Sequence, residues 1–190
     1  MSGNSKDLSL LARLTEASIA MVGLVVLSPV IVAAALAVRV TSPGPALLVQ
    51  DRVGRNEAPF RCLKLRTMWK DTAAVPTHEA SAGGITPVGR FLRRTKLDEL
   101  PQLWNVLKGE MSFVGPRPCL LTQEALISAR RRRDVYALRP GITGLAQARG
   151  VDMTDPERLA AIDAEYLAKR SLRLDAEILL ATLVPGLRAP

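Results

Sequence analysis

The feature of this sequence best suited to chemistry is an adjacent pair of acids, Asp98 and Glu99. Pro101 follows closely, and proline is best tolerated in the first turn of a helix, where its missing amide would be unpaired anyway. This spacing places Asp98 at or near a helix N-cap, where the positive end of the helix keeps a carboxylate ionised and where phosphate also binds. Such a carboxylate can act as a nucleophile or as a metal ligand. Because successive helical residues point about 100° apart, Glu99 can play a different role from Asp98 at the same site. The alternative is that the pair is only structural, with Asp98 capping the helix and Glu99 exposed to solvent.

Cationic side chains that can bind phosphate occur on both sides of this pair in the sequence. Lys64 and Arg66 share one face of a predicted strand, because strand side chains alternate with a period of two. Arg93 lies shortly before the acids, and Arg117 is held between two prolines that pre-order its backbone for a bidentate phosphate contact. Taken singly, each of these cations is more often a solvated surface charge. The run of four arginines at 130–133 is expected to face solvent or lipid headgroups.

An uncharged apolar segment of 22 residues occupies positions 17–38. As a straight helix it would extend about 33 Å, enough to cross the hydrocarbon core of a bilayer. Ser28 and Pro29 lie at its midpoint, and a proline there bends or breaks the helix. We therefore expect a re-entrant helix-break-helix that enters and leaves one leaflet on the same side; a spanning helix and a signal peptide are the alternatives. The six Lys and Arg residues between 39 and 66 favour the cytoplasmic side for the rest of the chain.

The remaining sequence predicts one small, membrane-associated α+β domain with amphipathic or interfacial helices. The Pro- and Gly-rich stretch 42–45 ends the apolar helix. The elements expected after it are a hairpin of strands at 47–53 and 60–68, a polar loop at 71–84, and helices at 100–107, from 156 behind the N-cap Asp155, and at 172–184. Cys62 and Cys119 are expected to be buried thiols.

Composition narrows the classes of partner. The chain has 26 Lys and Arg against 18 Asp and Glu, a net charge of +8, which predicts a partner rich in negative charge: nucleic acid, anionic lipid or a phosphorylated substrate. Only seven residues are aromatic and none are grouped as a stacking platform, so we expect no nucleic-acid binding. Two cysteines and one histidine, His78, are too few for a disulfide scaffold or a common zinc site and argue against a Ser-His catalytic pair.

Four blocks of sequence in a fixed order make the chain recognisable. They are KLRTM at 64–68, LDELPQLWNVLKG at 97–109, MSFVGPRP at 111–118 and RPGITGLAQ at 139–147. With these blocks the chain resembles the bacterial sugar transferase family, in particular the small monotopic phosphoglycosyl transferases that begin glycoconjugate assembly. The resemblance extends over nearly the whole chain and includes Ser28 and Pro29. It weakens at 148–152, where many relatives carry an Asn-Gly pair. We expect this region to shape the pocket that recognises the donor sugar.

The resemblance implies a fold, an activity and a location. Residues 1–40 would form a re-entrant membrane helix with a short tail, and residues 41–190 a catalytic domain on the cytoplasmic face of the bacterial inner membrane. Family members transfer a sugar 1-phosphate from a UDP-sugar to polyprenol phosphate, such as undecaprenyl phosphate, and release UMP. The sequence decides neither the sugar, nor the pathway, nor whether the protein forms a homodimer.

The resemblance also implies roles for the residues identified above. Asp98 would attack the β-phosphate of the donor and form a covalent phosphosugar-aspartyl intermediate, which polyprenol phosphate resolves in a second, ping-pong step. Glu99 would bind Mg²⁺, with Asp98 as a second candidate ligand. The cations that would bind phosphate oxygens are Lys64, Arg93 and Arg117, with Arg66 a weaker candidate.

A membrane adaptor without enzymatic activity is the alternative function. In that case the apolar segment is an anchor and the arginines bind anionic lipid. Release of UMP from a UDP-sugar in the presence of the lipid acceptor separates the two, because Asp98→Ala should abolish it while membrane binding stays intact.

Overall fold

The chain divides into two compact units, which are described in turn. Unit 1 comprises residues 1–50 and 62–109, and unit 2 comprises residues 51–61 and 110–190. The computed structural model describes residues 3–70 and 84–184. The polar loop expected at 71–84, with His78, therefore lies outside the described residues except for its last position.

Unit 1 contains the long N-terminal helix and the segment that carries the two acids. Its elements are α1 (Gly3–Thr41), α2 (Pro87–Thr95), the 3₁₀ turn η3 (Leu97–Glu99) and α3 (Gln102–Lys108). The predicted hairpin is confirmed as β1 (Leu47–Val53) and β2 (Pro59–Leu65), which pair in a two-stranded sheet. β2 ends earlier than predicted because the following residues leave it to pair with the approach to α2, where Thr86 N donates to Thr67 O at 3.0 Å and Trp69 N donates to Gly84 O at 3.1 Å.

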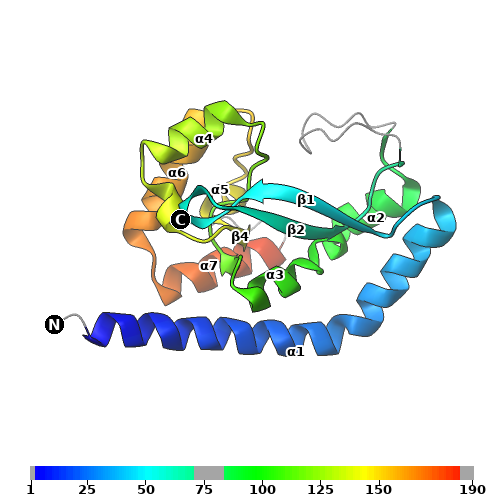
Figure 1. The fold of residues 1–190 in the computed structure, drawn as a ribbon, viewed down its shortest axis with the longest axis horizontal. Coiled ribbons are helices and arrows are strands. Elements are labelled where there is room, and N and C mark those ends of the chain that lie inside the picture. Colours follow the sequence, from blue (N-terminus) through cyan, green and yellow to red (C-terminus); the bar gives the residue numbers. More distant parts are fainter. Residues whose placement is uncertain (1–2, 71–83, 185–190) are drawn as a thin grey trace. The chain divides into compact units, whose positions relative to one another are not determined.

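Helix α1 is one continuous helix of 39 residues that passes through Ser28 and Pro29. It changes direction along its length but is not interrupted (Figure 1). Pro29 cannot donate to Val25 O, and Ser28 Oγ donates to that carbonyl instead at 2.8 Å, which replaces the missing backbone bond. The structure therefore does not show the expected break at Pro29, and the expected helix-break-helix is corrected to one uninterrupted helix.

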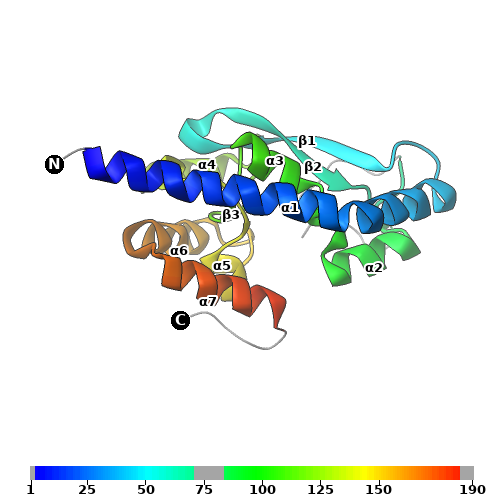
Figure 2. The same ribbon diagram turned by 90° about the horizontal axis from the view of Figure 1, so that it is seen from below.

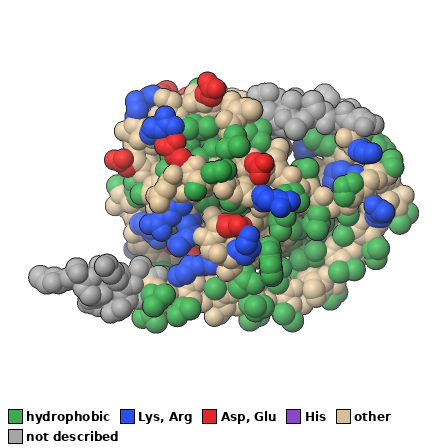
Figure 3. All heavy atoms as spheres, viewed as in Figure 1, with side chains coloured by type: hydrophobic (Ala, Val, Ile, Leu, Met, Phe, Trp, Pro, Cys, Tyr) green, Lys and Arg blue, Asp and Glu red, His purple; other side chains and the backbone are tan. Residues whose placement is uncertain are grey.

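One stripe of α1 packs within unit 1, while its other faces are apolar and exposed. The stripe includes the buried residues Ala20, Ala34 and Val38, and Gly23 lets α3 approach so closely that an added Cβ would lie 3.3 Å from Leu103 Cδ1. The exposed side chains include Leu14, Ile19, Met21, Val22, Val25, Val26, Val32, Leu36 and Val40. Apolar side chains are accordingly visible along the surface of α1 in Figure 3. By length and composition, the part of α1 from Leu10 to Thr41 is able to cross a membrane.

The described part of unit 2 combines a short parallel strand pair with α-helices and 3₁₀ turns. Its elements are η1 (Arg55–Glu57) at the hairpin turn, β3 (Ser112–Val114), α4 (Glu124–Arg131), η4 (Val135–Ala137), β4 (Gly141–Thr143), α5 (Leu145–Ala148), α6 (Pro156–Lys169) and α7 (Leu172–Leu183). α5 contacts both α6 and α7 (Figure 2). The helix behind Asp155 is confirmed, since the Asp155 carboxylate accepts a hydrogen bond from Arg158 N, and so is the last helix. Pairing of β3 with β4 was not predicted, because three-residue strands flanked by Gly and Pro have the sequence pattern of turns.

Both units have an apolar core. In unit 1, Ala34 and Val38 of α1 cluster with Leu65 and Leu92. In unit 2, one cluster contains Val114, Leu138, Leu145, Tyr166 and Ile178, and another contains Val53, Cys119, Leu126, Ala146 and Leu159. Cys62 and Cys119 are both buried free thiols, as predicted.

Candidate functional site

Asp98 lies in the 3₁₀ turn η3, at the beginning of a helical run that leads into α3. Lys96 ends α2 in a left-handed conformation, with φ +57°, and occupies the N-cap position of η3. The run continues through Pro101 with short-range bonds such as Trp104 N to Pro101 O at 3.1 Å. Asp98 is therefore near a helical N-terminus, as predicted, but the cap residue is Lys96. Asp98 itself is buried, with 9% of the residue exposed, which limits access of water to its carboxylate.

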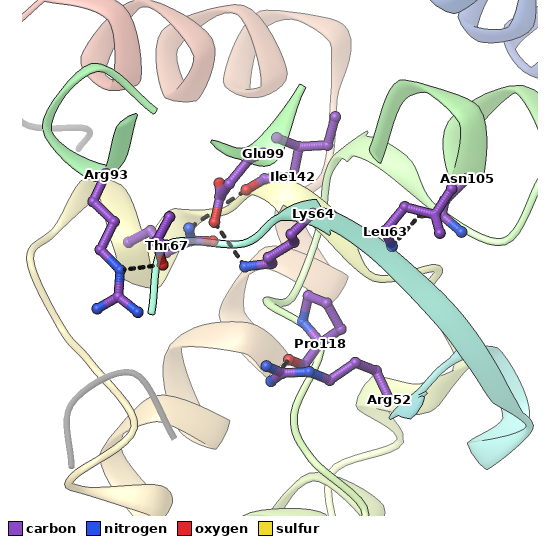
Figure 4. A network of polar contacts seen from close by, with 10 residues as sticks. Arg52, Leu63, Lys64, Thr67, Arg93, Glu99, Asn105, Pro118 and Ile142 are labelled. Carbon is purple, nitrogen blue, oxygen red and sulfur yellow. Dashed lines mark hydrogen bonds and ion pairs between the residues drawn. The ribbon is translucent and has the colours of Figure 1, made fainter. Parts of the chain in front are cut away.

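Glu99 forms an ion pair with Lys64 of β2. The Lys64 Nζ to Glu99 Oε1 distance is 3.0 Å, and the side chains are 16% and 14% exposed (Figure 4). The preceding residue, Leu63, donates its N–H to Asn105 Oδ1 of α3 at 3.0 Å. Successive residues of β2 thus hold the helical run that carries both acids. Asn105, 1% exposed, was not predicted from the sequence, because an uncharged residue inside a helix gives no signal of its own.

Arg93 is fixed on α2 by the residues that follow β2. Its Nε donates to Thr67 Oγ1 at 2.9 Å (Figure 4). Gly89 allows this approach, since a Cβ there would lie 2.0 Å from Thr67 O. Helix α2 also contacts η3, so the elements that carry Arg93, Lys64 and Asp98 are held together within unit 1.

Arg66 binds the residues at the end of α1. Its Nη2 donates to Ser42 O and to Ser42 Oγ, each at 2.8 Å. Gly44, with φ +108°, leaves room for it, because a Cβ would lie 2.4 Å from Arg66 Nη1. The shared strand face predicted for Lys64 and Arg66 is not formed, since β2 ends at Leu65. The structure therefore gives Arg66 a role in fixing the turn after α1.

Arg117 belongs to unit 2, where its backbone is held by a neighbouring arginine. Arg130 Nη1 donates to Arg117 O at 2.9 Å, and Arg130 Nη2 lies 2.7 Å from Asp163 Oδ2. Burial disfavours the charge of Arg130, but the Asp163 carboxylate outweighs that effect and raises the pKa of the guanidinium above its usual value. The expectation of a solvated patch at 130–133 is thus wrong for Arg130, which is 1% exposed.

The other three arginines of the run lie nearer the surface, and each forms an ion pair. Arg131 pairs with Glu57, with Nη2 and Oε2 2.6 Å apart. Arg132 and Arg133 both pair with Glu157. Their side chains are 61%, 55% and 31% exposed, so this part of the run matches the expected surface position.

Asp98 and Glu99 are the residues to test for a fit to Mg²⁺. Within residues 3–70 and 84–184, no group of three or more His, Cys, Asp and Glu side chains could hold a metal ion. Mg²⁺ is usually bound through one or two carboxylates together with substrate phosphates and water. The two adjacent acids therefore fit an ion that arrives with a diphosphate, and do not form a preassembled cage.

Comparison with known proteins places the chain among sugar transferases. It matches the family model described as bacterial sugar transferase over residues 8–189. A UDP-glucose:undecaprenyl-phosphate glucose-1-phosphate transferase of Caulobacter vibrioides is 45% identical over 84% of this chain and 63% of its own length. The protein of the same name from Escherichia coli K12 is 38% identical over 93% of this chain and 40% of its own length. A UDP-N-acetylgalactosamine-undecaprenyl-phosphate N-acetylgalactosaminephosphotransferase of Aeromonas hydrophila is 34% identical, over 86% and 40% respectively.

The chain spans less than two thirds of the length of these relatives. The family match nevertheless includes residues of both units and all the candidate site residues. The chain therefore belongs to the bacterial sugar transferase family.

Proposed function

We propose that this protein is a phosphoglycosyl transferase that moves a sugar 1-phosphate from a UDP-sugar to polyprenol phosphate, such as undecaprenyl phosphate, and releases UMP. The observation that carries the proposal is the buried Asp98 in η3 beside Glu99, whose carboxylate is held by Lys64. The names of three relatives describe transfer of a sugar phosphate to undecaprenyl phosphate, which supports the same reaction class here.

In the first half-reaction, a carboxylate oxygen of Asp98 attacks the β-phosphorus of the donor. The new bond joins that oxygen to phosphorus, and the bond from phosphorus to the bridging oxygen of the diphosphate breaks, so that UMP leaves. Lys64 and Arg93 bind the non-bridging oxygens, where cations stabilise the developing charge. Arg117 is a further phosphate ligand in the proposal. Arg66 is the weakest candidate, because its guanidinium already binds Ser42.

In the second half-reaction, a phosphate oxygen of the polyprenol acceptor attacks the same phosphorus. The bond to Asp98 breaks, the carboxylate is restored, and polyprenyl-diphosphate-sugar is formed by a ping-pong route. The burial of Asp98 favours this outcome, since water that reached the intermediate would hydrolyse it. Mg²⁺, held by Glu99 with Asp98 as a second candidate ligand, would offset charge on the diphosphate and on the departing UMP.

We also propose that α1 is re-entrant and does not cross the bilayer. Its first half packs on α3, where Arg13 Nη2 donates to Leu107 O at 2.9 Å, and its second half packs against Leu92 of α2. Both helices carry exposed cations, including Arg94 and Lys108, which a spanning orientation would draw into hydrocarbon at considerable cost.

The exposed side chains of unit 1 support a position at the membrane surface. The apolar faces of α1 would lie in one leaflet. Phe91 of α2 and Trp104 of α3, 59% and 50% exposed, are residue types found where helices contact the membrane interface. Residues 41–190 would then form the catalytic part on the cytoplasmic face of the inner membrane. Cysteine labelling tests this topology: positions near Ser2 and positions after Arg39 should react from the same side, and labelling from opposite sides would establish a spanning helix.

The activity is tested by measuring UMP release from UDP-sugars with undecaprenyl phosphate in detergent. UDP-glucose and UDP-N-acetylgalactosamine are the first donors to compare, since relatives use glucose 1-phosphate and N-acetylgalactosamine phosphate. We expect acceptor-dependent release that Asp98→Ala abolishes while vesicle binding is retained. Vesicle binding without UMP release from any UDP-sugar would instead identify the protein as a membrane adaptor.

A further inference from the structure

Every backbone carbonyl from Pro116 to Cys119 accepts a hydrogen bond from another part of unit 2. The bonds are Gly141 N to Pro116 O at 3.0 Å, Arg130 Nη1 to Arg117 O at 2.9 Å, Arg52 Nη1 to Pro118 O at 3.0 Å and Val53 N to Cys119 O at 3.0 Å. The bond from Arg52 is visible in Figure 4. We call these four contacts the carbonyl clamp.

The two side chains in the carbonyl clamp are buried arginines. Arg130 is 1% exposed and Arg52 is 8% exposed. Arg130 Nε also donates to Asp163 Oδ2 at 2.9 Å, and Nη2 forms an ion pair with the same oxygen at 2.7 Å. A buried guanidinium is costly unless it is paired and hydrogen-bonded. Two of them directed at adjacent carbonyls indicate that the backbone of this segment must be held in one position.

The residue that the clamp presents is Arg117. Residues 114–116 and 118–120 are all buried, and Arg117 between them is partly exposed. Pro116 and Pro118 restrict the φ angles of the segment and have no N–H. The four hydrogen bonds to the carbonyls restrict the rest of its backbone motion. A single cation thus emerges from a segment that is otherwise buried and immobilised.

We propose that Arg52 and Arg130 are positioning residues that hold Arg117 ready to bind a phosphate of the UDP-sugar. The inference rests on the phosphate-binding role given to Arg117 in the proposed function. A ligand group that is already ordered loses less conformational entropy on binding. Loosening the clamp should therefore weaken donor binding more than it slows the chemical steps.

The experiment measures kcat and KM for the UDP-sugar with the full chain and saturating polyprenol phosphate. Arg130→Met is expected to raise the donor KM about tenfold and to leave kcat within about twofold. In an Arg117→Ala background, the same substitution should change KM by less than about twofold, since residues that act through one another are not additive. Arg132→Met is the matched control, because Arg132 lies in the same run but pairs with Glu157 at the surface.

A purely structural role gives a different pattern. Loss of folded protein lowers kcat without changing KM, and it does so whether or not Arg117 is present; that result would overturn the proposal. If Arg130→Met does not fold, the same experiment is done with Arg52→Met and with the double variant Arg130→Met/Asp163→Leu, which removes both buried charges.

Two outcomes separate this inference from the proposed function. An unchanged donor KM in Arg117→Ala would show that Arg117 does not bind the donor phosphate, and the carbonyl clamp would then have no role in binding. An effect of Arg130→Met that persists fully without Arg117 would overturn the clamp alone.

Discussion

The two units each contain a pair of opposite charges that matters for the proposed site, and the pairs differ in burial. Lys64 and Glu99 in unit 1 are 3.0 Å apart with side chains 16% and 14% exposed. Arg130 and Asp163 in unit 2 are 2.7 Å apart with side chains 2% and 3% exposed. The first pair keeps some contact with solvent, whereas the second is enclosed by protein. In the proposed function, Lys64 of the first pair binds a substrate phosphate, and Arg130 of the second positions the backbone of Arg117.

The largest expected effect on stability comes from the enclosed pair. Arg130→Met leaves the Asp163 carboxylate buried without its partner, and we expect the free energy of unfolding to fall by about 3–5 kcal/mol. Denaturant unfolding of the purified protein in detergent measures this loss. Arg130→Met/Asp163→Leu should recover most of it, because no unpaired charge then remains buried. Unchanged stability of the single variant would show that the two pairs do not differ as described.

Loss of the Lys64–Glu99 pair should affect the reaction rate more than the stability of the protein. Lys64→Met is expected to lower the rate of UMP release about 100-fold, as loss of one charged phosphate contact does at other sites. Its free energy of unfolding should fall by less than that of Arg130→Met, because Glu99 is more exposed than Asp163. Lys108→Met, which removes an exposed lysine of α3, is the control. A full rate combined with a large loss of stability would make Lys64 a structural residue.

A smaller effect is expected where Arg66 fixes the turn after α1. Gly44→Ala combines a positive φ of +108° with a Cβ 2.4 Å from Arg66 Nη1, and we expect a loss of about 1–3 kcal/mol. Gly150 has φ +72° but no atom within 4 Å of an added Cβ. Gly150→Ala should therefore cost less, and thermal unfolding compares the two. Equal losses would show that crowding by Arg66 contributes nothing.

The smallest effect is expected at Glu165, near the surface of unit 2. Hydrogen bonds from Arg149 and then Lys169 lower the pKa of Glu165 to about 2. An acid whose pKa is lowered on folding stabilises the protein above its unfolded pKa, about 4.3, and this contribution disappears as the pH falls through about 2. Glu165→Gln should cost less than about 1 kcal/mol at pH 7. Thermal unfolding should show the difference from the parent shrinking between pH 4 and pH 2; a difference independent of pH would contradict the assignment.

The elements that the sequence predicted well have strong local signals. The alternation of side-chain types predicted the β1–β2 hairpin, and Asp155 followed by Pro156 predicted the start of α6. Arg130 was misjudged because its burial depends on Asp163, 33 residues later, and four consecutive arginines have the pattern of a solvated surface. Thr67 and Asn105 were missed because their contacts depend on tertiary packing. The helix continues through Pro29, where a break was expected, because Ser28 Oγ donates to the Val25 carbonyl that Pro29 cannot reach.

The central claim is that Asp98 carries the sugar phosphate between the two substrates. Intact-protein mass spectrometry of the full chain, incubated with Mg²⁺ and the UDP-sugar that supports UMP release but without polyprenol phosphate, tests it directly. We predict a mass increase of one sugar phosphate that maps to Asp98, disappears when polyprenol phosphate is added, and is missing in Asp98→Asn. An Asp98→Asn variant that turns over at the parent rate, with no adduct on the parent chain, would contradict the account.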